Sequence, residues 1–119
     1  MTMAGATLPY DETVWTKETR ESHRDLERLI RWYFPLAEQR RAIWVAWRVS
    51  NMSPLAFHRH SERGIGLFDI DPAEVGLPDS EAWLLHNPIR NVAAAYRVWR
   101  QKGWARWPDT DEPPKPFAS

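Results

Sequence analysis

The spacing of apolar residues predicts an amphipathic helix in the first third of the chain. From about Thr16, apolar positions recur at helical intervals with charged residues between them. These positions are Leu26, Leu29, Ile30 and Tyr33. Phe34 and Pro35 should end this helix, because proline does not fit inside one.

A second helix is expected to follow at once, over 36–52. This segment is apolar on most of its sides, as expected of a helix that is surrounded by the core. One stripe holds Ala42, Val45, Ala46 and Val49, and beside it lie Ile43, Trp47 and Ser50. We therefore predict that 36–52 is the buried central helix, and that Ser53 and Pro54 stop it.

The second half of the chain is expected to begin with a loop and to continue with helices. Glycines and alternating apolar residues over 57–72 favour a loop or a short hairpin, and a short helix is expected over 79–85. The last helix should have Asn87 as its cap and Pro88 as its first residue, and it should end at Gly103. Its buried face is predicted to carry Val92, Ala95, Tyr96 and Trp99.

Chain length and composition indicate one folded domain. The 119 residues are 43% apolar and 27% charged, which is ordinary for a folded protein. We expect an irregular lead-in over 1–15, one domain over 16–107 and an extended, proline-rich tail over 108–119. The predicted fold class is therefore mainly α, with a short hairpin or loop.

Charge and cysteine content argue against several classes of function. The 16 basic residues balance 16 acidic ones, so no overall field attracts nucleic acid. There is no cysteine, and hence no disulfide, thiolate metal site or cysteine nucleophile. No apolar run reaches the roughly 18 residues of a membrane span, and the first residues lack the pattern of a signal peptide. We expect no cofactor, no membrane span and no classical secretion.

The eight tryptophans supply large apolar area with a polar N–H, which suits a core or a groove that stacks sugars. We expect most of them to be core residues. Trp104 and Trp107 follow Gly103 and either stack on a ligand or close the core beneath the central helix. The second role is favoured.

Several short sequence blocks follow one another in a recognisable order. They are Val45 to Ser50, Pro54–Leu55–Ala56, Gly66 to Ile70, Asn87–Pro88, Asn91 to Tyr96, and Gly103 to Trp107. In this order and spacing they resemble the lysozyme-like domains of lytic transglycosylases of the SLT type, especially those of actinobacteria and their phages. The resemblance covers roughly 29–107 and implies a lysozyme-like fold.

The chain departs from this family at the catalytic position. The family's central helix ends in a glutamate followed by serine, five residues before the proline of the next block. Counting back five positions from Pro54 reaches Val49, which Ser50 follows. Asp69 stands where the family continues its glycine-leucine-phenylalanine run with glutamine. The equivalents of groove residues are Ser50, Gly66, Phe68, Asp69 and Tyr96.

A valine cannot give the proton that the leaving oxygen of a glycosidic bond needs. General acid catalysis contributes about 10²- to 10⁴-fold, so we expect no catalytic residue at Val49 and a core role instead. The alternative is a relocated acid, for which Glu62, Asp69 and Asp71 are the candidates. Otherwise these carboxylates are solvated or form turns, and Asp71 before Pro72 is a natural turn former.

Two other groups of polar residues do not fit a site. His58 and His60 are followed by Glu62, but their spacing suits metal binding only on a strand, and no fourth ligand is evident. A solvated loop is favoured, and no metal is predicted. Ser50 is not on a strained glycine-serine-glycine turn that would expose a nucleophile.

These considerations lead to a main hypothesis and two alternatives. The first is a degenerate lysozyme-like domain that is a structural or binding component of a phage virion, such as a minor tail protein, which contacts other virion proteins and retains or has lost peptidoglycan binding. The second is an active muramidase or lytic transglycosylase with a displaced acid. The third is an intracellular regulator that binds a protein through its tryptophan-rich surface. The expected location is the virion, and otherwise the cytoplasm.

Overall fold

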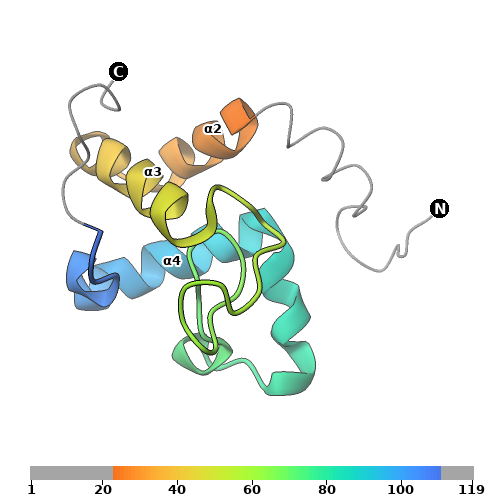
Figure 1. Ribbon diagram of the computed structural model, residues 1–119. Coiled ribbons are helices and arrows are strands. Elements are labelled where there is room, and N and C mark those ends of the chain that lie inside the picture. The colour runs from red at the N-terminus through yellow and green to blue at the C-terminus, as the bar shows by residue number, and fades with distance from the viewer. Residues whose placement is uncertain (1–22, 111–119) are drawn as a thin grey trace.

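The structure, a computed structural model, describes residues 23–110 (Figure 1). These residues form α-helices and shorter 3-10 helices in the order α2, α3, η2, η3, α4 and η4, and no sheet forms among them. Two isolated antiparallel bridges join Phe57 to Ile65 and Ile65 to Ile70. The predicted mainly α class with a loop is confirmed. The expected lead-in over 1–15 and most of the expected tail lie outside the described residues.

Helix α2 (His23–Tyr33) is amphipathic, as its apolar spacing predicts. It buries Leu26 and Ile30. The helix ends where expected, because Phe34 and Pro35 turn the chain and Pro35 adopts extended backbone as the N-cap of the next helix. The predicted start near Thr16 falls outside the described residues.

Helix α3 (Leu36–Ser50) forms where the second helix is predicted, but the expectation that it is the buried central helix is wrong. It packs mainly on α2 and leaves Leu36, Arg40 and Arg48 exposed, whereas the last long helix contacts α2 and the 3-10 helices. The buried residues of α3 are Ala42, Ile43, Val45, Ala46, Val49 and Ser50.

The helix ends slightly before the predicted Met52, because Asn51 adopts the left-handed conformation with a φ of 58°. The N–H of Asn51 then bonds the carbonyl of Trp47 at 3.0 Å, and the N–H of Met52 bonds that of Ala46 at 3.3 Å. Ser53 and Pro54 follow this turn and do not cause it.

The loop after α3 is tied to the last helix by one buried side chain. Asn91 accepts the N–H of Phe68 at 2.8 Å and donates to the carbonyls of Ile65 and Leu85 at 2.8 and 2.9 Å. Gly66 makes this approach possible, because a Cβ there would lie 2.4 Å from Nδ2 of Asn91. Asn91 therefore holds the loop against the last long helix through side-chain hydrogen bonds in place of sheet pairing.

Short 3-10 helices lead from the loop to the last long helix. They are η2 (Pro72–Val75) and η3 (Asp79–His86), and the second matches the short helix predicted over 79–85. After α4 (Pro88–Lys102), the chain forms η4 (Trp104–Arg106).

The ends of α4 form as predicted. Asn87 caps the helix by accepting the N–H groups of Ile89 and Arg90 at 2.9 and 3.3 Å. Pro88 is its first residue, and Gly103 ends it with a φ of 71°, a conformation that glycine adopts readily. On the predicted inner face, Val92 and Ala95 are buried, whereas Tyr96 and Trp99 are partly buried and pack against the core.

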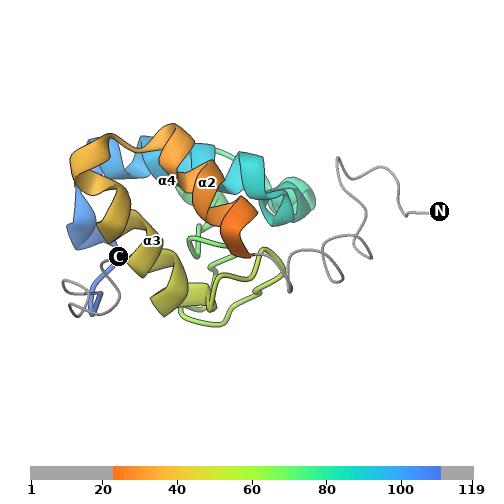
Figure 2. The ribbon, with the colours of Figure 1, turned by 90° about the horizontal axis from the view of Figure 1, so that it is seen from above.

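An aromatic cluster joins the turn between α2 and α3 to the chain that follows α4. The ring of Phe34 lies 5.5 to 5.9 Å, between centroids, from those of Phe68, Tyr96, Trp99 and Trp104. Trp107 is fully buried and donates its Nε1–H to the carbonyl of Phe68 at 2.7 Å. Helix α2 packs on both α3 and α4, and seen from above it lies across α4 (Figure 2).

The tryptophans divide between core and surface. Trp107 is in the core and Trp104 packs against it, so the favoured role of this pair in closing the core is confirmed. Trp47 and Trp99 also pack against the core. Trp32 and Trp83 are exceptions, at 83% and 42% exposed. Trp15 lies outside the described residues.

Packing continues a little beyond 107. Thr110 is buried and its hydroxyl donates to the carbonyl of Trp107, while Nη2 of Arg48 donates to the carbonyl of Asp109 at 3.1 Å. Among the helices of residues 23–110, none has the length and apolar character that crossing a membrane requires.

Candidate functional site

The position at which the resemblance leads us to expect a catalytic glutamate lies in the hydrophobic core. Val49 is on the last turn of α3 and is 2% exposed. It belongs to the same core cluster as Val45 and Phe68. A carboxylate at this depth would lose nearly all of its hydration. The predicted core role of Val49 is confirmed.

Ser50, which follows this position, is used to end the helix. Its hydroxyl donates to the carbonyl of Ala46 at 2.9 Å and accepts the N–H of Ser53 at 3.2 Å. The residue is fully buried. Both hydrogen bonds of this hydroxyl are therefore made inside the protein.

The other residues that the resemblance places in a groove lie in or beside the core. Gly66 and Phe68 are buried, and Gly66 lies directly against Asn91. Tyr96 is partly buried, with its ring edge-on to Phe34 and its hydroxyl accepting a hydrogen bond from Nη1 of Arg100 at 2.9 Å. The structure thus brings these residues close to the loop and α4 but does not expose them along a common groove.

Asp69 holds a buried carboxyl group with a raised pKa. The residue is 3% exposed, and its Oδ1 accepts the N–H of Ser61 at 3.3 Å, whereas its buried Oδ2 has no hydrogen-bond partner within residues 23–110. Burial raises the pKa above its usual 3.8, although the hydrogen bonds from Ser61 and the charges of His60 and Arg106 act in the opposite direction. A general acid needs a raised pKa, but this carboxyl group is covered by the chain.

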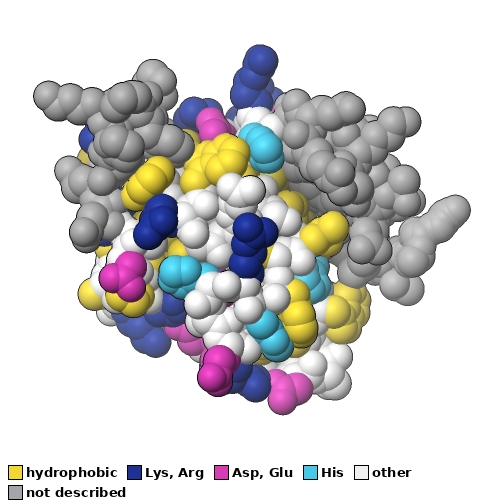
Figure 3. All heavy atoms as spheres, viewed as in Figure 1, with side chains coloured by type: hydrophobic (Ala, Val, Ile, Leu, Met, Phe, Trp, Pro, Cys, Tyr) yellow, Lys and Arg dark blue, Asp and Glu magenta, His cyan; other side chains and the backbone are white. Residues whose placement is uncertain are grey.

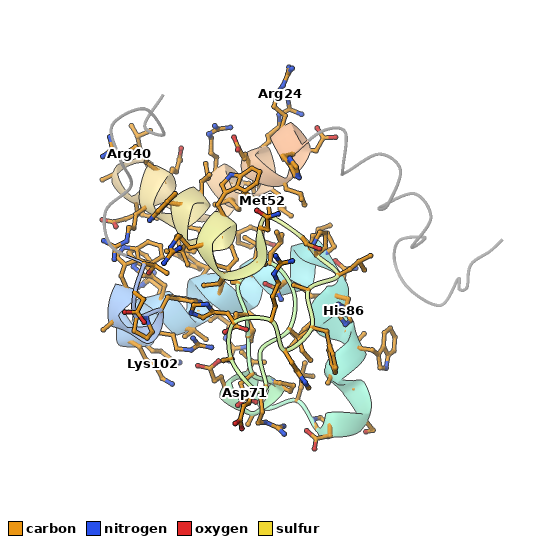
Figure 4. All side chains as sticks on the ribbon, in the orientation of Figure 1. Arg24, Arg40, Met52, Asp71, His86 and Lys102 are labelled. Atoms are coloured by element: carbon orange, nitrogen blue, oxygen red, sulfur yellow. The ribbon has the colours of Figure 1, made fainter. Side chains whose placement is uncertain are left out.

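The other candidate acids have simpler roles. Asp71 caps η2, because it accepts the N–H of Ala73 at 2.9 Å while Glu74 accepts the N–H of Asp71 at 3.0 Å. It also pairs with Arg63 at 3.2 Å, at the foot of the loop (Figure 4). The expected turn role of Asp71 is confirmed. Glu62 is an exposed loop residue.

A surface pocket of about 420 Å³ lies between the loop and η3. It is lined by Phe57, His58, Arg63, Ile65, Asp79, Ala82, Trp83 and His86. Phe57 and Trp83 are 59% and 42% exposed, so two aromatic faces are available to a ligand. On the face that carries the loop and η3, histidine and hydrophobic side chains gather together (Figure 3). None of the groove equivalents or candidate acids discussed above lines this pocket.

The polar groups of the pocket are held in place by neighbours. Nδ1 of His86 lies 3.1 Å from the carbonyl of Pro54. Because a carbonyl only accepts, Nδ1 must carry the proton, and Nε2 of the neutral ring is left as an acceptor. Arg63 donates to the carboxylate of Asp79 at 2.7 Å. In Figure 4, His86 lies on η3 and faces the loop. Exposed aromatic faces beside histidine and arginine suit a sugar ring or an aromatic side chain.

The two loop histidines separate in the folded chain. His58 lines the pocket and stacks on Phe57 with ring centroids 3.6 Å apart, whereas His60 is exposed and is not part of the lining. Within residues 23–110, no three or more side chains of the metal-binding types lie close enough together to hold an ion.

Sequence reasoning missed this pocket as a whole, including Trp83 and His86. Both lie on η3, a segment that the sequence identified only as a short helix. The exposure of Trp83 depends on how η3 packs against α4, which spacing along the chain does not reveal. Comparisons of the chain with protein-family models, curated proteins and solved structures found no match.

Proposed function

We propose that this chain is a catalytically degenerate lysozyme-like domain that acts as a structural or binding component. The likeness to lytic transglycosylase domains is carried by the order and spacing of the sequence blocks. The loss of catalysis is carried by one observation, the 2% exposed valine at the position of the family's acid.

The neighbouring carboxylates support a role without catalysis. Asp69 is covered by the loop, Asp71 caps η2, and Glu62 lies outside the pocket lining. The alternative of an active muramidase or lytic transglycosylase has one observation in its favour, the raised pKa of Asp69. That alternative requires the loop to open, because an acid must reach the oxygen that it protonates.

Clearing of isolated cell wall tests the loss of catalysis. The wild-type chain should leave the turbidity of a peptidoglycan suspension unchanged over hours, because no accessible acid is provided. If clearing occurs, Glu62→Gln, Asp69→Asn and Asp71→Asn should be tested one at a time. A variant among these that abolishes clearing would identify the relocated acid and overturn the proposal.

The pocket between the loop and η3 is the binding site in this proposal. Co-sedimentation with purified peptidoglycan should be weakened about fivefold by Trp83→Ala, since a ring stack contributes on the order of 1 kcal/mol. Trp32→Ala is the matched control, because Trp32 is also exposed but lies on α2. An equal loss of co-sedimentation in both variants would show that any exposed tryptophan adheres to peptidoglycan. If the wild type does not sediment, glycan binding is excluded and a structural role remains.

The proposed setting is a phage particle, and it rests on the resemblance. Wall-degrading domains of this family are carried in tail tips and baseplates, where a copy can lose catalysis and persist as a minor structural protein. Mass spectrometry of purified particles should detect the chain together with tail proteins. Detection only in the cytoplasm of infected cells would instead favour the intracellular regulator.

A further inference from the structure

A second surface pocket, of about 230 Å³, lies where η2, η3 and α4 meet. Helices η2 (green) and η3 (teal) lie below α4 in Figure 1. The pocket is lined by Val75, Leu77, Leu84, Leu85, Arg90, Ala93, Ala94 and Arg97. It shares no lining residue with the pocket between the loop and η3, and it is called the α4 pocket below.

The lining of the α4 pocket consists of aliphatic side chains and two arginines, with no aromatic ring, hydroxyl, amide or carboxylate. Leu77 and Leu84 are only partly buried, so part of the aliphatic lining is open to solvent. A polar group placed against this lining would lose its hydrogen bonds to water without gaining new ones. The pocket therefore suits an aliphatic side chain better than a sugar ring or a nucleotide base.

The two arginines of the α4 pocket are available to carboxylates. Arg90 and Arg97 are both exposed, and neither guanidinium forms an ion pair or a ring contact within residues 23–110. Glu74, which precedes Val75 in the chain, is already paired with Arg106 and with a lysine of α4. The rim of the pocket thus carries two positive charges without an acidic partner in this part of the chain.

The spacing of the two arginines matches a pair of carboxylates. Arg90 and Arg97 are seven residues apart on α4, which is about two turns or 10.5 Å along the helix. Ala93 and Ala94 lie between them on the same side, and their small side chains leave room for a partner to approach. Convergence of both arginines on a single carboxylate would bring like charges together and cover the aliphatic lining.

We propose that the α4 pocket binds an acidic amphipathic helix of a partner protein. A leucine of that helix enters the pocket, and carboxylates one turn before and after it pair with Arg90 and Arg97. Ile89, which is one turn before Ala93 and 56% exposed, extends the apolar contact toward the start of α4. The inference is independent of the proposed function, because it uses neither Val49 nor the pocket between the loop and η3.

Fluorescence anisotropy of a labelled peptide tests this binding with the full-length chain. The probe is a stapled helical peptide of about 15 residues with glutamate, leucine and glutamate at positions i, i+4 and i+7. A matched peptide of the same composition has its second glutamate on the opposite face of the helix. The first peptide should bind saturably and about two- to fivefold more tightly, because only it can form both exposed ion pairs.

Equal affinity of the two peptides would overturn the proposal, as would the absence of saturable binding up to about 1 mM. Octanoate tests the other occupant of an aliphatic pocket with a basic rim, a small molecule with one carboxylate. Full displacement of the first peptide by an equimolar amount of octanoate would assign the pocket to such a molecule and overturn the proposal.

Neutral substitution of the arginines tests the rim of the pocket. Arg90→Gln combined with Arg97→Gln should weaken binding of the first peptide about tenfold, as expected for the loss of two exposed ion pairs. Arg24→Gln combined with Arg59→Gln removes the same charge from exposed sites outside the lining and should change the affinity less than about twofold. An equal loss in both double variants would show attraction by net charge alone and would refute the assigned site.

Filling the pocket tests the apolar contact separately. Ala93→Trp keeps both arginines but occupies the space for the leucine, so it should weaken binding at least about tenfold. Ala37→Trp, at an exposed alanine of α3, is the control and should leave binding unchanged. Circular dichroism and Tm verify that both variants are folded. Undiminished binding to a folded Ala93→Trp variant would place the peptide elsewhere.

The decisive experiment exchanges the charges of both partners. Arg90→Glu combined with Arg97→Glu should abolish binding of the first peptide and create binding of its analogue in which lysine replaces both glutamates. Failure of this variant to bind the lysine peptide would refute recognition through these two positions.

Discussion

The carboxylate of Asp69 occupies the space that a side chain at Gly64 would fill. A Cβ at Gly64 would lie 1.6 Å from Oδ1 and 2.2 Å from Cγ of Asp69. The same carboxylate accepts the N–H of Ser61, and the carbonyl of Asp69 accepts a hydrogen bond from Nη2 of Arg106 at 2.8 Å. Asp69 therefore joins the segment around Ser61 to the chain after α4.

Gly64→Ala should lower the free energy of unfolding by about 2–4 kcal/mol, because the loop must move away from Asp69 to accept one methyl group. Urea unfolding followed by circular dichroism measures the change. Arg59→Ala, an exposed position in the same loop, should stay within about 0.5 kcal/mol. Asp69→Gly should reduce the penalty of Gly64→Ala, since it removes the clashing group. A Gly64→Ala variant of unchanged stability would contradict the packing described.

Because its pKa is raised, Asp69 should make the free energy of unfolding depend on pH. Between the usual 3.8 and the raised value in the folded state, the unfolded chain has already lost the proton that the folded chain keeps. Unfolding then releases a proton, so the contribution of Asp69 to stability falls as the pH rises through this interval. Burial of the charge remains a cost at higher pH.

Asp69→Asn removes this titration while keeping the size of the side chain. Its free energy of unfolding should therefore rise relative to the wild type as the pH increases above about 3.8 and then stay level. Urea midpoints from pH 3 to pH 7 for both proteins provide the comparison, and the titration of Glu74 cancels in the difference. Parallel profiles for the two proteins would show that Asp69 is not perturbed.

Arg106 and Glu74 form a partly buried ion pair, with side chains 16% and 13% exposed. Burial alone would raise the pKa of Glu74, but hydrogen bonds from Arg106 and from the N–H of Asp71 outweigh it and lower the pKa. The stabilisation from this pair is therefore present above the usual 4.5 and is lost as the pH falls through the lowered value.

Arg106→Leu should cost about 3 kcal/mol at pH 7, because it leaves the Glu74 carboxylate poorly compensated. The difference from the wild type should shrink at a pH below the lowered pKa of Glu74. Lys102→Met is the control. Its ammonium is half exposed and 3.6 Å from Glu74, so its removal should cost less than about 1 kcal/mol. A loss for Arg106→Leu that does not vary with pH would mean that packing, not charge, stabilises this contact.

Val49→Asp should destabilise the domain by about 3–5 kcal/mol, because an unpaired carboxylate among apolar residues must disrupt packing or remain protonated. Val49→Thr, which keeps the shape and adds only a hydroxyl, should cost roughly 1–3 kcal/mol. Thermal and urea unfolding of the two variants measure these costs. An unchanged stability of Val49→Asp would place this side chain at the surface and remove the argument from its burial.

Local patterns determined much of the helical framework. The spacing of Leu26 and Ile30 marks the inner face of α2, and the side-chain cap of Asn87 with Pro88 marks the start of α4. These features depend on residues within one or two turns of each other, so they can be predicted from the sequence alone. The same holds for the depth of Val49, which follows from its place in the apolar stripe of α3.

The sites depend on contacts between distant residues. Asp69 is a loop aspartate by sequence, and its burial arises only when Gly64, Ser61 and Arg106 close around it. Likewise, the pocket combines Phe57 with Trp83 and His86 across segments that no local rule joins. Side-chain spacing therefore determined which faces of α2, α3 and α4 turn inward. Only the tertiary structure decided which polar groups lost their water, because desolvation depends on every segment that packs against a group.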